Sequence, residues 1–375
     1  MKISAIRWQD FSLPLTRSYE SSEERGNTKF GLLLALQEQS GKVGFGESSP
    51  IGLGNKSSIS AVAKEFENLG PSLLNMEING LEDIFLRDVD AISPCVRFGI
   101  ETALLDLWGK ITGSTAANII GIKETKPIPC NAIIATNNVK GAVKEAVKAI
   151  SFGFTSLKLK VGQGSEYSDE VLVSSVREAI GPKIKLRIDA NQAWTVKQAI
   201  RRIQKLEKYT LEYVEQPSAK DNLRSMKEIS ESVEVKIAAD ESLGSLRDLE
   251  DIVNTNAADI LIVKPSRIGG FSKTLEVISE GIRSNKSIVV TTSLDSSLGI
   301  SASVTLASSI LTHSFAHGLS TGLMLKKDLT QDVCVPKDGF ISVAKADGIG
   351  IRIDIESLKN LWDIKINKSL GIWQY

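Results

Sequence analysis

Five charged residues recur at nearly regular intervals in the middle of the chain. They are Lys160, Asp189, Glu215, Asp240 and Lys264, and successive members are 29, 26, 25 and 24 residues apart. Three carboxylates at equivalent positions of neighbouring structural units would converge, and ligation by oxygen atoms alone suits Mg²⁺, with Mn²⁺ as an alternative ion. A lysine on each side of such a cluster could carry a proton. The spacing therefore predicts metal-assisted proton transfer.

A second lysine lies two positions before Lys160, in the run SLKLKVG. The alternation of this run is typical of a β-strand and places Lys158 and Lys160 on one face. If the strand is central, both ammonium groups point into the interior, where the carboxylates would stabilise them. We expect the paired lysines and the metal to lower the pKa of Lys160 toward that of a useful base.

A structural explanation of the same charges is an ion network in the core. Lys158 and Lys160 could pair with Asp189 and Glu215, and a lone carboxylate at a strand end is often a helix N-cap. Five charges in phase over consecutive units favour chemistry over this alternative. Asn191 shares a face with Asp189, so it is a candidate ligand or supporting group.

Glu241 directly follows Asp240 in the sequence. Because neighbouring residues of a strand face opposite ways, it is expected to point away from the cluster or to cap the next helix.

The elements that would position these residues begin near residue 128. Short β-rich runs alternate there with amphipathic segments such as 139–150 and 166–180, in about eight units. This alternation predicts an α/β fold with a (β/α) barrel over 126–335, whose active site lies at the carboxyl ends of the strands. A doubly wound open sheet is the alternative, but no strand is followed by a dinucleotide-binding glycine fingerprint.

The regions outside the predicted barrel have a different pattern. Residues 1–125 indicate an α+β domain with a hairpin around Ser40-Gly41 and a helix over 96–110, and we expect segment 336–375 to return to it. Lys+Arg and Asp+Glu both number 45, and this balance argues against nucleic-acid binding. The sequence shows no leader-like start and no apolar run of ~18 residues, which argues against a membrane span. Three scattered cysteines suit the cytoplasm, and the sequence is silent on oligomeric state.

At these charged residues the sequence resembles the enolase superfamily, in particular its muconate-lactonizing-enzyme-like subgroup. The motifs that carry the resemblance are Lys158-Leu159-Lys160, Asp189-Ala190-Asn191, Glu215-Gln216-Pro217, Asp240-Glu241-Ser242 and Lys264. The resemblance implies a modified (β/α)7β barrel, with an N-terminal α+β capping domain that the C-terminal segment completes.

The resemblance also implies a mechanism. Mg²⁺ would bind Asp189, Glu215 and Asp240, and a proton α to a carboxylate would be removed to give an enolate. Lys160 would be the base on one side of the substrate, Lys264 would stand on the other, and Lys158 would tune Lys160.

The choice of substrate rests on residues near the last two strands. Superfamily members that epimerise dipeptides usually carry Asp-x-Asp at the end of the eighth strand, where this sequence has Gly318-Leu319-Ser320. The stretches KPSRIGG, LDSSLG and GLSTG are instead similar to o-succinylbenzoate synthases. This likeness implies that Ser296, Ser297 and Gly299 lie near a substrate carboxylate, with Gly318 and Ser320 close by. The expected reaction is dehydration to o-succinylbenzoate, for menaquinone or phylloquinone synthesis.

Three other functions stay open at this stage. A dipeptide or N-acylamino-acid epimerase would use Lys160 and Lys264 as two opposed bases, and a muconate-type cycloisomerase would use the same ring of residues. A barrel without catalysis would only bind a ligand. In each enzyme the partner is a small carboxylate, which Arg17, Tyr19 or Arg25 and the loop 50–54 could contact.

Overall fold

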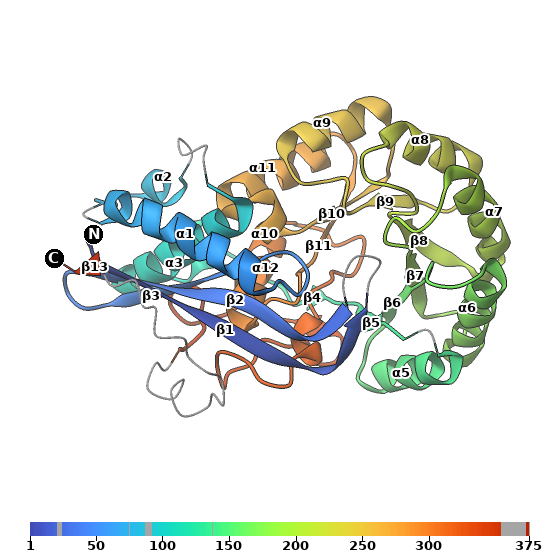
Figure 1. Ribbon diagram of the computed structural model, residues 1–375, viewed down its shortest axis with the longest axis horizontal. Helices are drawn as coiled ribbons and strands as arrows, with labels where there is room; N and C mark the ends of the chain where they lie inside the picture. The colour runs from blue at the N-terminus through green and yellow to red at the C-terminus, as the bar shows by residue number, and fades with distance from the viewer. Residues whose placement is uncertain (21–24, 75, 87–91, 137, 354–372, 375) are drawn as a thin grey trace.

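The computed structural model describes residues 1–20, 25–74, 76–86, 92–136, 138–353 and 373–374. Figure 1 shows a β-sheet with its helices at one end of the molecule and a curved sheet inside an arc of helices at the other. These two parts are the predicted capping domain and barrel.

The capping domain is built on an antiparallel sheet of order β13-β1-β2-β3. Its strands are β1 (Ile3–Glu20), β2 (Arg25–Glu38), β3 (Val43–Ser48) and β13 (Trp373–Gln374). The expected hairpin around Ser40-Gly41 is confirmed by the pairing of β2 with β3, and Gly41 has the positive φ that a tight turn requires. Pairing of β13 with β1 returns the chain end to this sheet. Segment 354–372 of the predicted returning region lies outside the described residues.

Four helices accompany this sheet: α1 (Lys56–Leu73), α2 (Leu81–Ile84), α3 (Pro94–Thr112) and α4 (Ala116–Ile119). The expected helix over 96–110 lies within α3. Helix α3 approaches β3 closely because Gly46 has no side chain, and a Cβ there would stand 1.9 Å from the carbonyl oxygen of Gly99. An apolar core that includes Trp8, Phe66 and Phe98 joins the layers.

The barrel sheet is parallel and has the order β11-β10-β9-β8-β7-β6-β5. Its strands are β5 (Ala132–Ile134), β6 (Ser156–Lys160), β7 (Lys185–Asp189), β8 (Leu211–Glu215), β9 (Ile237–Ala239), β10 (Ile260–Val263) and β11 (Ser287–Val290). The helices between and after them are α5 (Val139–Ser151), α6 (Glu166–Ile180), α7 (Val196–Leu206), α8 (Leu223–Ser232), α9 (Leu246–Thr255), α10 (Pro265–Ile268), α11 (Gly270–Arg283) and α12 (Ser297–Ala307). Ser165, Thr195 and Ser245 begin three of these helices as side-chain N-caps.

Two parallel β-bridges close the barrel between the end of β11 and the residues before β5, at the place of an eighth strand. Residues 317–318, here named the closing segment, form parallel bridges from Gly318 to Thr291 and from His317 to Cys130. The backbone N–H of Gly318 donates to Val290 O at 2.9 Å, and that of His317 to Pro129 O at 2.7 Å. A Cβ at Gly318 would lie 2.3 Å from Thr291 Oγ1, so only glycine permits this approach. The predicted (β/α)7β fold is thus confirmed.

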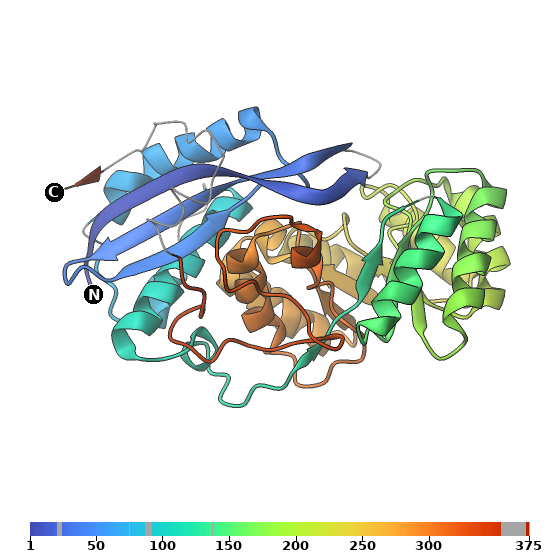
Figure 2. The same ribbon diagram turned by 90° about the horizontal axis from the view of Figure 1, so that it is seen from below.

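The β1–β2 hairpin carries the capping domain to the mouth of the barrel, as Figure 2 shows from below. Leu15 bridges to Leu325, and the Lys326 N–H donates to Pro14 O at 2.8 Å. Beside these bonds, the apolar side chains of Leu15, Leu53, Leu294 and Met324 pack together. The two parts therefore share a small core at the barrel mouth.

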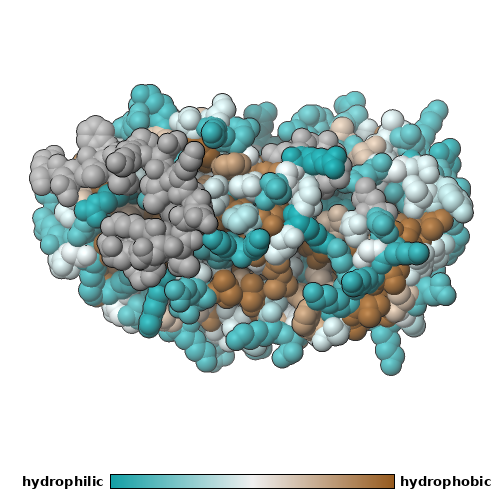
Figure 3. Space-filling model, turned by 60° about the horizontal axis from the view of Figure 1, so that its bottom comes forward, coloured by the Kyte–Doolittle hydropathy of each residue, from teal (hydrophilic) through white to brown (hydrophobic). Residues whose placement is uncertain are grey.

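On the surface, hydrophilic side chains surround patches of apolar residues (Figure 3). Exposed large apolar residues in the described chain include Phe152, Leu311 and Leu323. No helix within the described ranges has the length and apolar character to cross a bilayer. Cys95, Cys130 and Cys334 are all free thiols.

Candidate active site

A cavity of about 200 Å³ opens at the carboxyl ends of the barrel strands, beneath the capping domain. One side, the charged wall, consists of Lys158, Lys160, Asn191, Asp240, Glu241, Lys264 and Arg267. The other, the neutral wall, consists of Ile51, Gly52, Thr291, Thr292, Ser293, Leu294, Thr321 and Met324. Tyr19 and Ile133 complete the lining.

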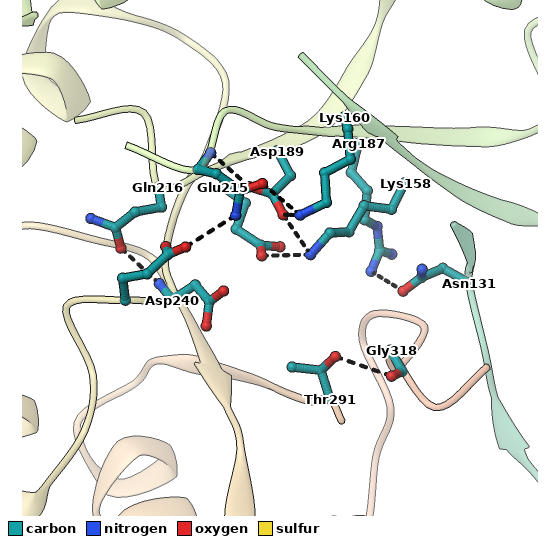
Figure 4. A network of polar contacts seen from close by, with 12 residues as sticks. Asn131, Lys158, Lys160, Arg187, Asp189, Glu215, Gln216, Asp240, Thr291 and Gly318 are labelled. Atoms are coloured by element: carbon teal, nitrogen blue, oxygen red, sulfur yellow. Dashed lines mark hydrogen bonds and ion pairs between the residues drawn. The ribbon is translucent and has the colours of Figure 1, made fainter. Parts of the chain in front are cut away.

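The lysine pair of β6 faces the carboxylates of β7 and β8, as Figure 4 shows. Lys158 Nζ lies 2.5 Å from Glu215 Oε1 and 2.9 Å from Asp189 Oδ2. Lys160 Nζ lies 2.7 Å from the same Asp189 oxygen and 2.6 Å from Asn191 Oδ1. Parallel register explains the convergence, because Lys160 is the direct neighbour of Asp189, and Asp189 of Glu215. The predicted interior position of both lysines is confirmed.

The fifth and sixth strands add a second group of charges. Asp240 follows β9 and accepts hydrogen bonds from Lys264 and, at 2.7 Å, from Arg267 Nη1. Arg267 also donates to the backbone oxygen of Asp240. Arg267 has no place in the regular spacing of charges, but it lies three residues after Lys264, and this nearness is a signal for a group on the same side of the barrel.

The carboxylates have opposite pKa shifts although all are buried. Burial, and then repulsion from Asp189, raises the pKa of Glu215 to about 8. Burial would also raise the pKa of Asp189, but Lys158 and Lys160 outweigh it and hold that pKa far below its ordinary value. Lys264, followed by Arg267, likewise outweighs burial and lowers the pKa of Asp240.

The lysines on the two sides of the cavity also differ. Burial opposes the charged form of Lys160, but attraction to Asp189 outweighs it and raises the pKa of Lys160. This direction is opposite to the one expected from the sequence, because the contacts of Lys160 here are with carboxylate and amide oxygens. Burial and then the Arg267 charge lower the pKa of Lys264.

The donor set fits a hard divalent cation. Glu215 Oε2 is buried and accepts no hydrogen bond from the described residues, which leaves one carboxylate oxygen available as a ligand. The Lys158 ammonium already bridges Asp189 and Glu215 as a stand-in cation. Within the described chain, however, no three acidic, histidine or cysteine side chains stand in a ready metal-binding arrangement. The assignment of Asp189, Glu215 and Asp240 to a metal stays a prediction.

Asn191 and Glu241 both lie on the charged wall. Asn191 has a φ of 43°, which turns the chain after β7, and its Nδ2 donates to Glu241 Oε1 at 3.0 Å. The expectation that Glu241 points away from the cluster is therefore wrong. The chain has already left β9 at Asp240, so strand alternation does not govern the direction of Glu241.

The serines and glycine after β11 lie behind the cavity and do not line it. Ser296 N and Oγ and Gly299 N donate to the Glu47 carboxylate of the capping domain, while Ser297 N and Oγ donate to Asp328. A Cβ at Gly299 would stand 3.0 Å from Glu47 Oε2, so the glycine makes room for Glu47. These N–H and O–H groups, predicted to lie near a substrate carboxylate, instead donate to protein carboxylates at the junction of the two domains.

The closing segment also positions the neutral wall. Gly318 O accepts from Thr291 Oγ1 at 3.0 Å, and Ser320 Oγ donates to Asn131 O at 2.7 Å, so the side chain of Ser320 is directed away from this cavity. The next residue, Thr321, lines the cavity and bonds to Thr292. The motif GLSTG gave no signal for Thr321, because this residue begins a 3-10 helix, Thr321–Met324, where the alternation of a strand does not govern side-chain direction.

Only some of the capping-domain residues predicted to contact substrate line the cavity. Tyr19 lines the cavity, as do Ile51 and Gly52 of the predicted loop. Arg17 forms an ion pair with Glu145 of α5 and donates to Ile133 O, so it joins the hairpin to the barrel. Arg25 begins β2 and is exposed, while residues 21–24 lie outside the described chain.

Comparison with known proteins identifies the class that this fold and site define. The family model described as Enolase C-terminal domain-like matches residues 141–358, and the chain belongs to that family. Its relatives place it in the muconate-lactonizing-enzyme-like subgroup of the enolase superfamily. The predicted family is thus confirmed.

Individual relatives have different activities. L-Ala-D/L-Glu epimerase of Bacillus subtilis is 27% identical over 358 residues, 94% of this chain and 97% of the epimerase. The o-succinylbenzoate synthase of Thermobifida fusca is 32% identical over 254 residues, 66% of this chain and 78% of the synthase. A solved structure of a Cytophaga hutchinsonii dipeptide epimerase with Mg and the dipeptide D-Ala-L-Val has a TM-score of 0.88 and 25% identity, and the match covers 100% of this chain and 99% of the epimerase.

Proposed function

We propose that this protein is a Mg²⁺-dependent lyase that removes a proton α to a carboxylate and expels water, in the manner of an o-succinylbenzoate synthase. The substrate would be a succinyl-hydroxycyclohexadiene carboxylate. The 32% identity to the synthase of Thermobifida fusca supports this class of reaction.

The observation that carries the proposal is the composition of the neutral wall. Among the described residues that line the cavity, the acidic side chains are Asp240 and Glu241, and both belong to the charged wall. At the position where dipeptide epimerases usually have Asp-x-Asp, this sequence has Gly318-Leu319-Ser320. A substrate ammonium group on that side would lose water without gaining a carboxylate partner. A substrate that carries only negative charge has no such cost.

The proposed reaction uses Lys160 in two consecutive steps. Lys160 must first lose its own proton, because attraction to Asp189 raises its pKa; that attraction would weaken if Asp189 bound Mg²⁺. The neutral amine then takes the α-proton, and the electron pair of the broken C–H bond forms the enolate. The C–O bond to the β-hydroxyl then breaks, and the Lys160 ammonium returns its proton so that water leaves. The ring becomes aromatic, and Lys160 is again a neutral amine.

The opposite side of the cavity would stabilise charge. Lys264 in its protonated form would stand beside the developing enolate, held in place by Asp240. Asp189, Glu215 and Asp240 would hold Mg²⁺, or Mn²⁺ in its place, and the ion would neutralise charge on the substrate carboxylate. The capping domain would exclude water from the reaction through Tyr19 and Ile51.

The test is a turnover assay on the succinyl-hydroxycyclohexadiene carboxylate with Mg²⁺. We expect dehydration that EDTA abolishes and that Lys160→Ala lacks. No dehydration by the wild-type protein under conditions that saturate Mg²⁺ would contradict the proposal.

A second candidate is an epimerase of dipeptides or N-acylamino acids. It is favoured by the two lysines that line one cavity from different strands, and by the match to the Bacillus subtilis epimerase along nearly its whole length. Incubation of L,L-dipeptides and N-succinylamino acids in D₂O separates the candidates. Lys160-dependent deuterium incorporation at the α-carbon with loss of configuration, and no dehydration, would identify an epimerase.

A further inference from the structure

A lysine in the capping domain is completely buried and does not line the cavity. Lys29 of β2 has 0% relative exposure. Its Nζ donates to Pro50 O and to Gly52 O, each at 2.6 Å. A buried ammonium group is costly unless it is hydrogen-bonded, so these contacts need a structural or functional explanation.

The two carbonyls belong to a loop that forms part of the cavity. Ile51 lies between them in sequence, and both Ile51 and Gly52 belong to the neutral wall. Gly52 has a φ of 74° and Gly54 one of 68°, so the loop contains two turns that favour glycine. Such a loop has little regular structure of its own, apart from the bond from Phe30 N–H to Leu53 O. Lys29 therefore ties the loop to the rigid strand β2.

Acidic groups behind the neutral wall complete the surroundings of Lys29. The buried carboxylates of Glu47 and Asp295 interact electrostatically with each other and with Lys29. Glu47 binds the N-terminus of α12 through Ser296 and Gly299, as described above. Asp295 directly follows Leu294 of the neutral wall. Lys29 thus contacts the 50–54 loop of its own domain and stands near Glu47 and Asp295, which meet at the junction of the two domains.

We propose that Lys29 is a positioning residue that holds the 50–54 loop against the substrate cavity and thereby sets which substrate fits. This inference rests on the proposed function for the identity of the substrate, but not for the position of the loop. Lys29 acts through Ile51 and Gly52 and does not itself touch the substrate.

The first test measures the loop in the free protein, without any substrate. In Lys29→Met, hydrogen exchange of a peptide that covers 50–54 should become about tenfold faster, because the loop loses two charge-assisted hydrogen bonds. Peptides from β6 to β8 should exchange as in the wild type. Lys110→Met is the matched control, since Lys110 is another capping-domain lysine that donates to a backbone oxygen, that of Val43, at 3.0 Å. It should leave exchange at 50–54 unchanged.

The second test separates positioning from general damage to the fold. With whichever substrate the protein turns over, Lys29→Met should raise KM about tenfold and change kcat less than about threefold. Lys29→Gln keeps a neutral donor, so it should have intermediate values of both exchange and KM; it also serves as the test variant if Lys29→Met does not fold.

The proposal is overturned if exchange at 50–54 stays at the wild-type rate, or if it rises equally in Lys110→Met. It is also overturned if kcat falls as much as KM rises. A protein that fails to dehydrate the proposed substrate but shows the loop-specific exchange would refute the proposed function alone.

Discussion

The charged wall and the neutral wall of the cavity are built by different means. The charged wall comes from the ends of consecutive strands β6 to β10, whose register brings Lys160, Asp189 and Glu215 side by side. The neutral wall combines the turn after β11, the residues after the closing segment and a loop of the capping domain. Regular strands position most residues of the charged wall, whereas contacts between segments distant in the sequence position those of the neutral wall.

This difference separates the chemistry from the choice of substrate. The candidate groups for proton transfer and metal binding lie at the ends of one continuous sheet, whose strands pair with one another. The groups that we propose to decide which molecule fits include Ile51 and Thr321, which line the cavity from different domains. In a family that shares one reaction step but acts on many substrates, we expect the residues of the neutral wall to vary. The relatives of this chain do differ in substrate.

The largest effect is expected at the charged wall. Lys160→Ala should reduce kcat/KM at least about 10³-fold, because Lys158, the other amine of β6, is held between Asp189 and Glu215 and cannot replace it as the base. Steady-state kinetics measures the loss, and circular dichroism checks the fold. If Lys264→Ala were severe and Lys160→Ala mild, the roles of the two lysines would have to be exchanged.

Glu215→Gln tests the metal assignment next to the charged wall, where Glu215 pairs with Lys158. The variant keeps the shape of the side chain but loses the carboxylate whose Oε2 has no described partner. Activity should fall at least about 100-fold, and the stabilisation of the protein by Mg²⁺ in thermal unfolding should disappear. Undiminished Mg²⁺ stabilisation in this variant would place the ion elsewhere.

A charge placed on the neutral wall should have a moderate effect. Thr321→Asp introduces a carboxylate into the lining of the cavity, and Thr321→Asn has nearly the same size without the charge. For a carboxylate substrate, KM should be about tenfold higher in the aspartate variant than in the asparagine variant because like charges repel. Equal KM values would mean that the substrate carboxylate does not face this wall.

The smallest effect concerns stability behind the neutral wall. Burial, followed by the nearby Asp295 charge, raises the pKa of Glu47 from its ordinary 4.5 to about 7. The folded protein therefore keeps a proton that the unfolded chain releases, and this group lowers the free energy of unfolding as pH rises from about 4.5 to about 7. The loss is on the order of 1–3 kcal/mol.

Urea unfolding of the wild type and of Glu47→Gln between pH 5 and pH 8 measures this contribution. The difference in unfolding free energy, wild type minus variant, should decrease over the lower part of this range and be constant above about pH 7. An increase with pH would show that Glu47 is ionised throughout the range.

The charged wall could be predicted from the sequence because charged residues recur there at regular intervals. One charge at each strand end, repeated every 24 to 29 residues, is visible without any structure. The neutral wall has no such period. Ser296 and Ser297 have the residue types of an anion-binding site, but their N–H and O–H groups donate to Glu47 and Asp328. No pattern in the sequence indicates those contacts.

The direction of the pKa shift of Lys160 could not be predicted from the sequence. Lys160 was expected to be shifted by its neighbour Lys158, but Asp189 lies 2.7 Å from its Nζ and dominates the result. Such balances depend on distances of a few tenths of an ångström, and a residue pattern does not fix them.

The β1–β2 hairpin has a consequence for how such a protein can diverge. Its strands begin in the core of the capping domain and extend to the barrel mouth, where Leu15 meets Leu325 and Tyr19 reaches the cavity. We expect substitutions of Tyr19 to alter the cavity lining while the paired strands behind it keep the fold intact. Natural selection can therefore explore new substrates there at low risk, and gene duplicates would be expected to accumulate differences first at this end of the hairpin.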